Sequence, residues 1–252
     1  VSKDVMNNLR FNGFKNVRDS ILDLKFEIFG VNKQIDNMGE LQRVSKGYTN
    51  RIIVGNFIDY VVSKMMVVNF PANVKSFDLN LIHRYQTFLQ SANNKKMYHN
   101  YVDKISDWKD ILEDIYHISS YKMKETNGEL KDFLLGSEMY KFLCSIEKGL
   151  ISMIKKVHNK VSRIYTHYNI TFDLVRGELD LLIDDHLIEI KSSMYQACSL
   201  ANLSQALIYG YLVEKKEVKV NKVSIYNPLM GTMTSFDTSK FDFVEFKTKI
   251  YN

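Results

Sequence analysis

The spacing of apolar residues changes near residue 161, and this change most constrains what the chain can fold into. Before it, apolar residues recur every three to four positions, the spacing that places them on one face of a helix. After it, short runs of β-branched and alternating residues are separated by turn residues, a pattern typical of strands. This order of elements predicts an α/β (α+β) fold with a mixed central sheet: helices come first, followed by three strands, a helix and a further pair of strands.

The expected elements follow from these patterns. Helical spacing is found in five early segments: Val5–Phe29, Ile52–Val68, Phe77–Gln90, Tyr101–Ile118 and Leu130–Val157. Strands are expected over Val161–Leu174, Gly177–Ile183, Leu187–Lys191, Val218–Tyr226 and Thr232–Phe236, with helices over Leu203–Glu214 and Phe241–Ile250. No Pro-, Gly- or Ser-rich linker lies at 158–161, so we expect the helical region, 1–158, to pack on the core, 159–252, as one compact unit.

Composition excludes several classes of protein. With 252 residues, of which 45% are hydrophobic, the chain can bury a sizeable core and does not resemble a disordered protein. The two cysteines, Cys144 and Cys198, exclude a disulfide-stapled scaffold and a four-cysteine iron–sulfur cluster. The six histidines lack the spacing of a zinc site, so each is expected to be structural or exposed.

Charge and hydropathy bear on partners and location. The net charge of +5 and a pI near 8.9 are compatible with a nucleic-acid partner without requiring one. The most apolar window, 52–70, is interrupted by Asp59, Ser63, Lys64 and Asn69, and no signal peptide is evident near residue 1. We therefore expect a soluble, intracellular protein with no membrane association.

Residues 177–191 read as a β-hairpin with acidic side chains. Asp184-Asp185 is a turn signal between two apolar runs, and a turn centred there pairs Asp180 with Glu189 and Glu178 with Lys191. One face is then expected to hold Glu178, Asp180, Leu182, Leu187, Glu189 and Lys191. The other is expected to hold Leu179, Leu181, Ile183, Ile188 and Ile190.

Three carboxylates and a lysine on one face allow two interpretations. Burying carboxylates side by side raises their pKa or requires a cation, and hard oxygen ligands favour Mg²⁺ or Mn²⁺. Lys191, on the face of Glu189, can then hold a water or a phosphate oxygen. The alternative is a solvated outer face of an edge hairpin, with Glu178 and Lys191 as a surface ion pair of little energetic value.

Gly177-x-x-Asp180, Glu189-x-Lys191 and the later Gln205-Ala-Leu-Ile-Tyr209 resemble three motifs of one family. In this order and spacing they are similar to the core of the PD-(D/E)XK nuclease superfamily, in its RecB-like and lambda-exonuclease-like branch. The resemblance covers about residues 161–236. It implies a restriction-endonuclease-like mixed central sheet flanked by helices, behind a helical N-terminal region.

The resemblance also implies roles for residues. Asp180 and Glu189 would bind Mg²⁺ or Mn²⁺, with the Ile190 carbonyl as a further ligand. Lys191 would orient the attacking water and stabilise charge on the scissile phosphate, which agrees with the chemistry of phosphodiester cleavage.

Gln205 and Tyr209 lie one helical turn apart, and the resemblance would place them along the strand-binding groove. A helix face packed on the sheet, with Tyr209 partly buried, explains the same spacing. Arg176, four residues before Asp180, is the basic residue best placed to contact nucleic acid.

Members of this family often add an acid or histidine from an upstream helix through a Gly-x-x-x-Glu or Gly-x-x-x-His element. The best match is Gly55-Asn-Phe-Ile-Asp59, because an acid is unusual inside so apolar a run. Glu138 and Glu147, on the helix before the first expected strand, are competing candidates.

The resulting expectation is a Mg²⁺-dependent deoxyribonuclease that hydrolyses DNA phosphodiester bonds and carries no iron–sulfur cluster. Single- and double-stranded DNA, endonuclease and exonuclease action, and the oligomeric state stay open. RNA as the substrate is an alternative. A second is a catalytically weak module of nuclease fold that binds nucleic acid or a protein, although the complete Asp180, Glu189 and Lys191 set argues against it.

Overall fold

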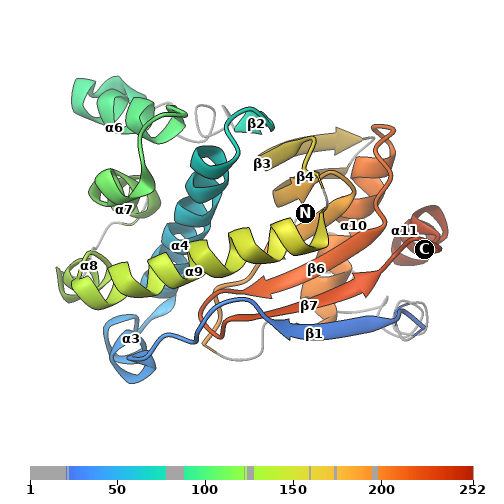
Figure 1. The fold of residues 1–252 in the computed structure, drawn as a ribbon, viewed down its shortest axis with the longest axis horizontal. Coiled ribbons are helices and arrows are strands. Elements are labelled where there is room, and N and C mark those ends of the chain that lie inside the picture. The colour runs from blue at the N-terminus through green and yellow to red at the C-terminus, as the bar shows by residue number, and fades with distance from the viewer. Residues whose placement is uncertain are drawn as a thin grey trace.

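A computed structural model describes residues 21, 23–77, 88–121, 123, 128–158, 160–172, 175–194 and 198–251. Its strands form one mixed sheet in the order β1-β7-β6-β5-β4-β3-β2 (Figure 1). The pairs β2–β3 and β5–β6 are parallel, and the other neighbours are antiparallel. The strands are β1 (Phe26–Gly30), β2 (Val74–Phe77), β3 (Ile164–Phe172), β4 (Val175–Ile183), β5 (His186–Ile190), β6 (Lys222–Asn227) and β7 (Thr232–Asp237).

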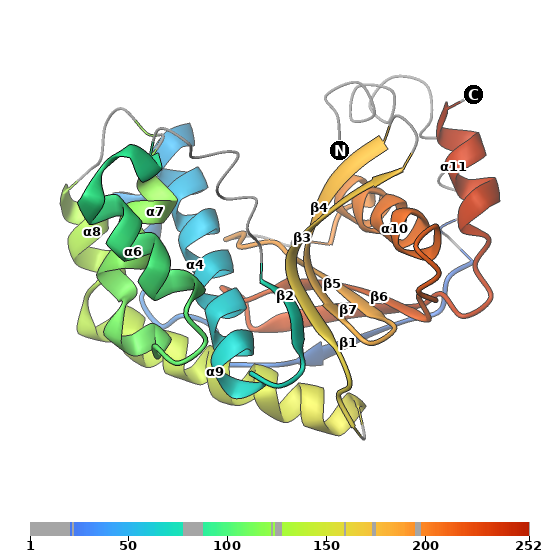
Figure 2. The same ribbon diagram turned by 90° about the horizontal axis from the view of Figure 1, so that it is seen from above.

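Helices cover both faces of this sheet and extend beyond one end of it (Figures 1 and 2). On one face lies α9 (Ser137–Val157), and on the other lie α10 (Leu200–Glu214) and α11 (Phe243–Tyr251). The remaining described helices form the group beyond the sheet: α3 (Met38–Val44), α4 (Tyr48–Asn69), α6 (Ala92–Val102), α7 (Leu112–Ser120) and α8 (Gly128–Leu134). Short 3₁₀ turns occupy Phe88–Gln90 and Trp108–Asp110.

The sheet separates two apolar cores. Ile183, Ile188 and Tyr226 belong to the core shared with α4 and α9. Leu182 and Leu187, their neighbours along the strands, belong to the core shared with α10 and α11. Alternate residues of the central strands therefore enter opposite cores, as expected for a sheet covered on both faces.

The central helix α4 joins the helical group to the sheet. It is buried over most of its length and contacts α7, α9 and β3. By length and composition it is the one described helix that could cross a membrane, but 67% of its most apolar window is buried inside the protein. It therefore packs as a core helix, and some of its polar side chains, such as Ser63 and Lys64, are buried inside the protein.

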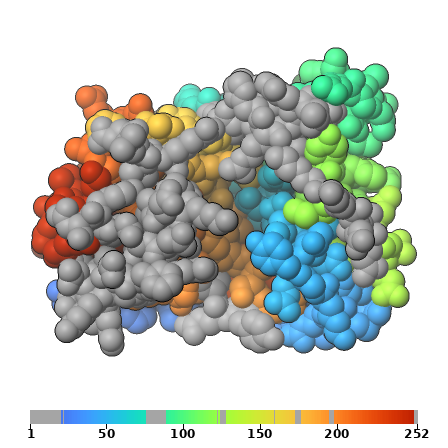
Figure 3. All heavy atoms as spheres, turned by 180° about the vertical axis from the view of Figure 1, so that it is seen from behind, coloured from blue at the N-terminus to red at the C-terminus, as the bar shows by residue number. Residues whose placement is uncertain are grey.

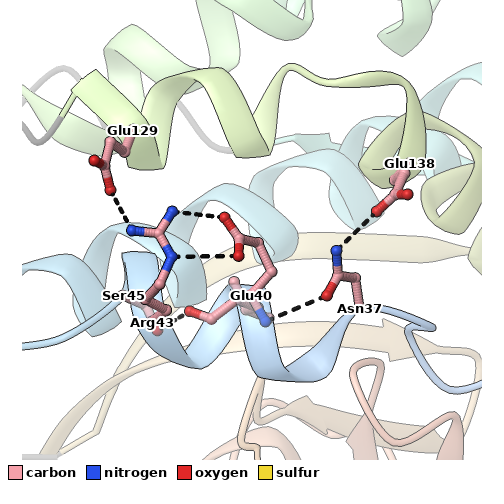
Figure 4. Close-up of polar contacts among 7 residues, drawn as sticks. Asn37, Glu40, Arg43, Ser45, Glu129 and Glu138 are labelled. Carbon is pink, nitrogen blue, oxygen red and sulfur yellow. Dashed lines mark hydrogen bonds and ion pairs between the residues drawn. The ribbon is translucent and has the colours of Figure 1, made fainter.

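Polar contacts attach α3 to the helices above it (Figure 4). Arg43 donates to Glu40 at 2.6 Å and to Glu129 of α8 at 2.7 Å. Asn37 accepts from the Glu40 amide and donates to Glu138 of α9 at 3.2 Å. The side chain that caps α3 thus also links it to α9.

The mixed α/β architecture is confirmed, and several boundaries were wrong. Phe26–Phe29 belongs to β1, not to a helix, because these residues pair with β7. The expected helix Tyr101–Ile118 is two helices separated at 103–111, and Leu130–Val157 is interrupted at Leu135 and Gly136. Residues 1–20, 22 and 78–87, which carry parts of two expected helices, lie outside the described residues.

Candidate active site

The hairpin formed by β4 and β5 has the register predicted from its turn. Leu181 pairs with Ile188, Leu182 with Leu187 and Ile183 with His186. Asp184 takes a left-handed conformation in the turn (φ 52°), and its carboxylate accepts from the amide of Arg163 at 3.0 Å. The turn is therefore fixed to the segment that leads into β3.

The pairing ends before the acids are reached, which corrects the expected face assignment. No Asp180–Glu189 ladder pair follows the Leu181–Ile188 pair; instead, Asp180 Oδ2 accepts from the Ile190 amide at 2.7 Å. Leu179 packs in the same core as Leu182, so the strict alternation predicted for β4 was wrong. The two strands separate here, and the Asp180 carboxylate occupies the fork between them.

Glu189 is buried beside this fork. The residue is 1% exposed, and its Oε1 accepts from Lys191 Nζ at 2.6 Å. Its Oε2 is buried with no hydrogen-bond partner among the described residues. Burial and the nearby Asp180 carboxylate raise the pKa of Glu189 to about 8. A solvated outer face with a Glu178–Lys191 pair is thus not what forms.

Lys191 is the cation of this fork. Burial alone would lower its pKa, but the Glu189 and Asp180 carboxylates hold the pKa above its ordinary value. The ammonium is therefore charged at neutral pH. Its amide also donates to the Tyr226 carbonyl at 2.8 Å, which anchors the segment just after β5 to β6.

Asp59 reaches the same site from α4. Burial, with contributions from Asp180 and Glu178, raises its pKa to about 7, although His167 opposes the shift. Its Oδ1 is buried without a partner among the described residues. An acid of the central helix thus lies close enough to Asp180 and Lys191 for their charges to affect its ionisation.

His167, which no sequence pattern singled out as a site residue, also belongs to this cluster. His167 Nδ1 lies 3.8 Å from Asp59 Oδ2 and 3.5 Å from Glu178 Oε1, and the ring packs edge-on to Tyr60. Burial would lower the pKa of His167, but Asp59 and Glu178 raise it to about 9. A single histidine in a β-branched run offers no sequence signal, so only the fold could reveal this group.

The helix α10 supplies Gln205 and Tyr209. Gln205 Nε2 donates to the Tyr209 hydroxyl at 2.8 Å, and burial and Glu189 raise the pKa of that hydroxyl. Tyr209 is 3% exposed, and its ring lies against Gly177 of β4, where any Cβ would overlap it. The residue therefore packs on the sheet and at the same time borders the acidic fork.

The remaining candidates lie elsewhere or are described only in part. Glu138 contacts Asn37, and Glu147 pairs with Lys109 at 3.1 Å, so Asp59 is the upstream acid that the fold brings to the fork. Arg176 pairs through its backbone with Thr171 near the far end of β4, and its side chain lies outside the described residues.

The charges of this cluster indicate what it can bind. Asp59, Glu178, Asp180 and Glu189 bring four carboxylates, against the two cations Lys191 and His167. When all six groups are ionised, two negative charges are left over. One divalent cation would neutralise them. The donors are hard oxygens, and two of them are buried without partners, which fits Mg²⁺ or Mn²⁺. Within the described ranges, no three His, Cys, Asp or Glu side chains already converge as a finished metal site.

The space-filling view from behind shows the blue residues near α3 and α4 on one side and the yellow and orange residues of the sheet and α10 on the other (Figure 3). The acidic fork belongs to both parts, since Asp59 comes from the first and the other acids from the second. No family model matches the chain, and no curated protein or solved structure matches it.

Proposed function

We propose that this protein is a divalent-metal-dependent nuclease with a restriction-endonuclease-like fold of the PD-(D/E)XK type, and that it hydrolyses DNA phosphodiester bonds. The observation that carries the proposal is the buried fork, where carboxylates outnumber cations by two and a charged lysine adjoins them. Burying like charges together costs free energy, so such a cluster favours a function that supplies a cation.

In this proposal Asp180, Glu189 and Asp59 would hold the cation, with the Ile190 carbonyl as a further ligand. A bound Mg²⁺ or Mn²⁺ would polarise the phosphoryl group and lower the pKa of a water. Lys191 would hold a phosphate oxygen or the attacking water and stabilise the developing negative charge. Its ammonium lies 2.6 Å from Glu189 Oε1, beside the carboxylates that would hold the cation.

Gln205 and Tyr209 would border the path of the nucleic-acid strand. Their mutual hydrogen bond fixes the orientation of the Tyr209 hydroxyl, which lies close enough to Glu189 to respond to its charge. A donor held in this way suits a phosphate oxygen next to the reacting one.

The test is cleavage of labelled single- and double-stranded DNA and of RNA, with Mg²⁺, Mn²⁺ or EDTA. Asp180→Asn keeps an oxygen that can accept from the Ile190 amide, and Lys191→Met keeps the length of the side chain. We expect both variants to lose at least about 100-fold in rate, because Asp180→Asn removes a charged ligand of the cation and Lys191→Met removes the ammonium that would stabilise transition-state charge. Glu138→Gln and Lys95→Met are matched controls of the same chemistry on residues remote from the fork.

Metal-independent cleavage, or equal activity of Asp180→Asn and the wild type, would contradict the proposal. Tight binding without cleavage under any of these conditions would favour the catalytically weak binding module. Cleavage of RNA alone would change the substrate and leave the site assignment in place.

A further inference from the structure

A groove of about 1020 Å³ runs between β1 and α9, on the face of the sheet opposite to α10. At one point the two elements meet closely, because a Cβ on Gly149 of α9 would overlap the carbonyl of Val31, just after β1. The groove is lined by one acid, Glu27, and by five lysines: Lys33, Lys141, Lys148, Lys156 and Lys222.

The lysines are arranged along the groove. Lys141, Lys148 and Lys156 of α9 alternate with Ser145 and Ser152 at intervals of three or four residues, which places all five on one helical face. From Lys141 to Lys156 the helix rises about 22 Å, at about 1.5 Å per residue. A row of lysines and serines of this length suits an extended anion better than a small one.

Four of these five lysines are exposed and form no ion pair with a described carboxylate: Lys33, Lys141, Lys148 and Lys156. Lys222 is half-buried and lies opposite Asp237 in the β6–β7 ladder, where its charge lowers the pKa of that carboxyl. The groove therefore presents a net positive surface to solvent.

We propose that this groove binds the phosphate backbone of nucleic acid, as a second surface separate from the acidic fork. It deepens the proposed function, on which it rests for the class of substrate. Lysine acts as a point charge on a flexible stem and suits repeated phosphates, and serine hydroxyls donate to phosphate oxygens. An acidic protein surface would be expected to meet aromatic and arginine anchors, and Phe29 is the one aromatic side chain among the described lining residues.

Such a surface would add affinity that does not depend on sequence. In B-DNA one strand carries a phosphate about every 3.4 Å of axis, so a 22 Å stripe spans about six phosphates. The substrate would be held along α9 and β1 while another part of it enters the fork. Substrates too short to reach both surfaces would gain nothing from the groove.

The experiment measures binding of a labelled 30-nucleotide single strand and the matching duplex across a salt series. Protein carrying Asp180→Asn is used in EDTA, so that cleavage plays no part. The groove variant adds Lys33→Gln, Lys141→Gln, Lys148→Gln and Lys156→Gln. The control adds Lys95→Gln, Lys96→Gln, Lys216→Gln and Lys240→Gln, which are exposed lysines outside the groove with the same total charge change.

We expect the groove variant to bind at least tenfold more weakly, and the slope of log affinity against log salt to fall by about 3, since each phosphate contact contributes about 0.7 to 0.9. The control should change both quantities by less than a third as much. Equal losses in the two variants, an unchanged groove variant, or stronger competition by polyglutamate than by DNA of equal charge would overturn the proposal.

Binding and cleavage measurements together distinguish a failure of the groove from a failure of the nuclease proposal. With Asp180 intact and Mg²⁺ present, the groove variant should cleave a short oligonucleotide at the wild-type rate and a long one more slowly. If the wild type cleaves nothing but the groove variant loses binding as expected, the nuclease proposal fails and the surface stands. If the wild type cleaves and the groove variant binds normally, the surface fails alone.

Discussion

His167 has a left-handed backbone (φ 48°) inside β3, a conformation that costs free energy for a non-glycine residue. The side chain it positions is buried and lies between Asp59 and Glu178. Strain at such a position persists when the surrounding contacts offset it, and here the offset is the attraction of one imidazolium to the Asp59 and Glu178 carboxylates. We infer that His167 is a positioning residue that holds the Asp59 carboxylate toward the fork.

His167→Asn should separate this role from simple packing. Asparagine tolerates the left-handed conformation and can still donate a hydrogen bond, but it removes one positive charge. We expect the cleavage rate at saturating Mg²⁺ to fall at least tenfold, while Mg²⁺ binds more tightly by several-fold because the site becomes more negative. Calorimetric titration with Mg²⁺ measures the affinity, and cleavage assays measure the rate. Opposite changes in these two quantities are the expected result.

A purely structural histidine would give a different pattern, with metal affinity and rate declining together. His99→Asn, on the exposed side of α6, is the matched control and should change neither quantity.

The fork holds two more carboxyl groups than cations, so a divalent cation that binds there should stabilise the folded protein. A ligand that binds only the native state stabilises it, by about 2.7 kcal/mol at 100 times its dissociation constant. For a protein of this size that is about 5 to 10 °C in the melting temperature. Mg²⁺ or Mn²⁺ should therefore raise the melting temperature of the wild type but not that of Asp180→Asn.

K⁺ at matched ionic strength is the control for general screening. An equal rise in Asp180→Asn, or no rise at saturating Mn²⁺ in the wild type, would show that the fork does not bind the cation.

Strand β4 and helix α10 approach each other closely at Gly177. Gly177 allows the ring of Tyr209 to lie directly on the strand, because any Cβ there would overlap it. This gives a physical reason for the glycine in the Gly177-x-x-Asp180 pattern that the sequence alone does not supply. The close approach sets the distance of Gln205 and Tyr209 from the fork.

Gly177→Ala should therefore displace Tyr209 and destabilise the protein by about 1 to 3 kcal/mol, the usual cost of overpacking. Activity on long DNA should fall more than the fraction of folded protein does. Urea unfolding and cleavage assays on the same preparation measure both. Gly39→Ala, at an exposed position of α3 where an added Cβ meets no atom within 4 Å, should lose neither stability nor activity.

A second polar cluster lies at the start of β5, at the opposite end of the strand from the fork. The rings of His158 and His186 stack at 5.6 Å, and His186 Nε2 is 2.6 Å from the Ser224 hydroxyl. Burial lowers the pKa of both histidines, and Lys222 lowers them further while Asp184 and Asp185 oppose the shift at His158. Both rings are therefore neutral in the folded protein near pH 7.

The stability that these two neutral histidines contribute depends on pH. A folded pKa below the unfolded value gives stability that is complete above about pH 6.5 and is lost as pH falls. Between pH 7.5 and 5.5 we expect each histidine to cost up to about 1.4 kcal/mol, since pH 5.5 lies about one unit below the unfolded pKa. Urea unfolding of the wild type and His186→Gln at both pH values gives the difference.

His186→Gln should lose less stability on acidification than the wild type, by up to that amount. An equal loss in the two proteins would show that His186 does not carry the effect. His117→Gln, at a half-buried histidine of α7 that lies outside this cluster, should preserve the wild-type dependence.

The sequence patterns predicted more of the sheet than of the helical region. The order of β3, β4, β5, α10, β6 and β7 and the register of the β4–β5 hairpin followed from local signals. The edge strands β1 and β2 were missed, because a short strand is stabilised by its pairing with a distant segment. Phe26, for example, pairs with Phe236, far along the chain.

The same contrast holds for the site. Asp180, Glu189 and Lys191 were named because their spacing along one hairpin is local, whereas His167 carried no signal at all. Asp59 was singled out by an acid inside an apolar run, and only the packing of α4 showed that it, unlike Glu138 and Glu147, reaches the fork.

By itself the sequence determined which segments become the central strands β3 to β7, where the β4–β5 hairpin turns, and which acids lie near that turn, because these features depend on residues close together in the chain. The tertiary structure alone decided that β4 and β5 separate at Asp180, that Asp59 and His167 meet there, and that five lysines line one groove. Each of these depends on contacts between segments far apart in the sequence, whose free energy is set by packing and by burial of charge.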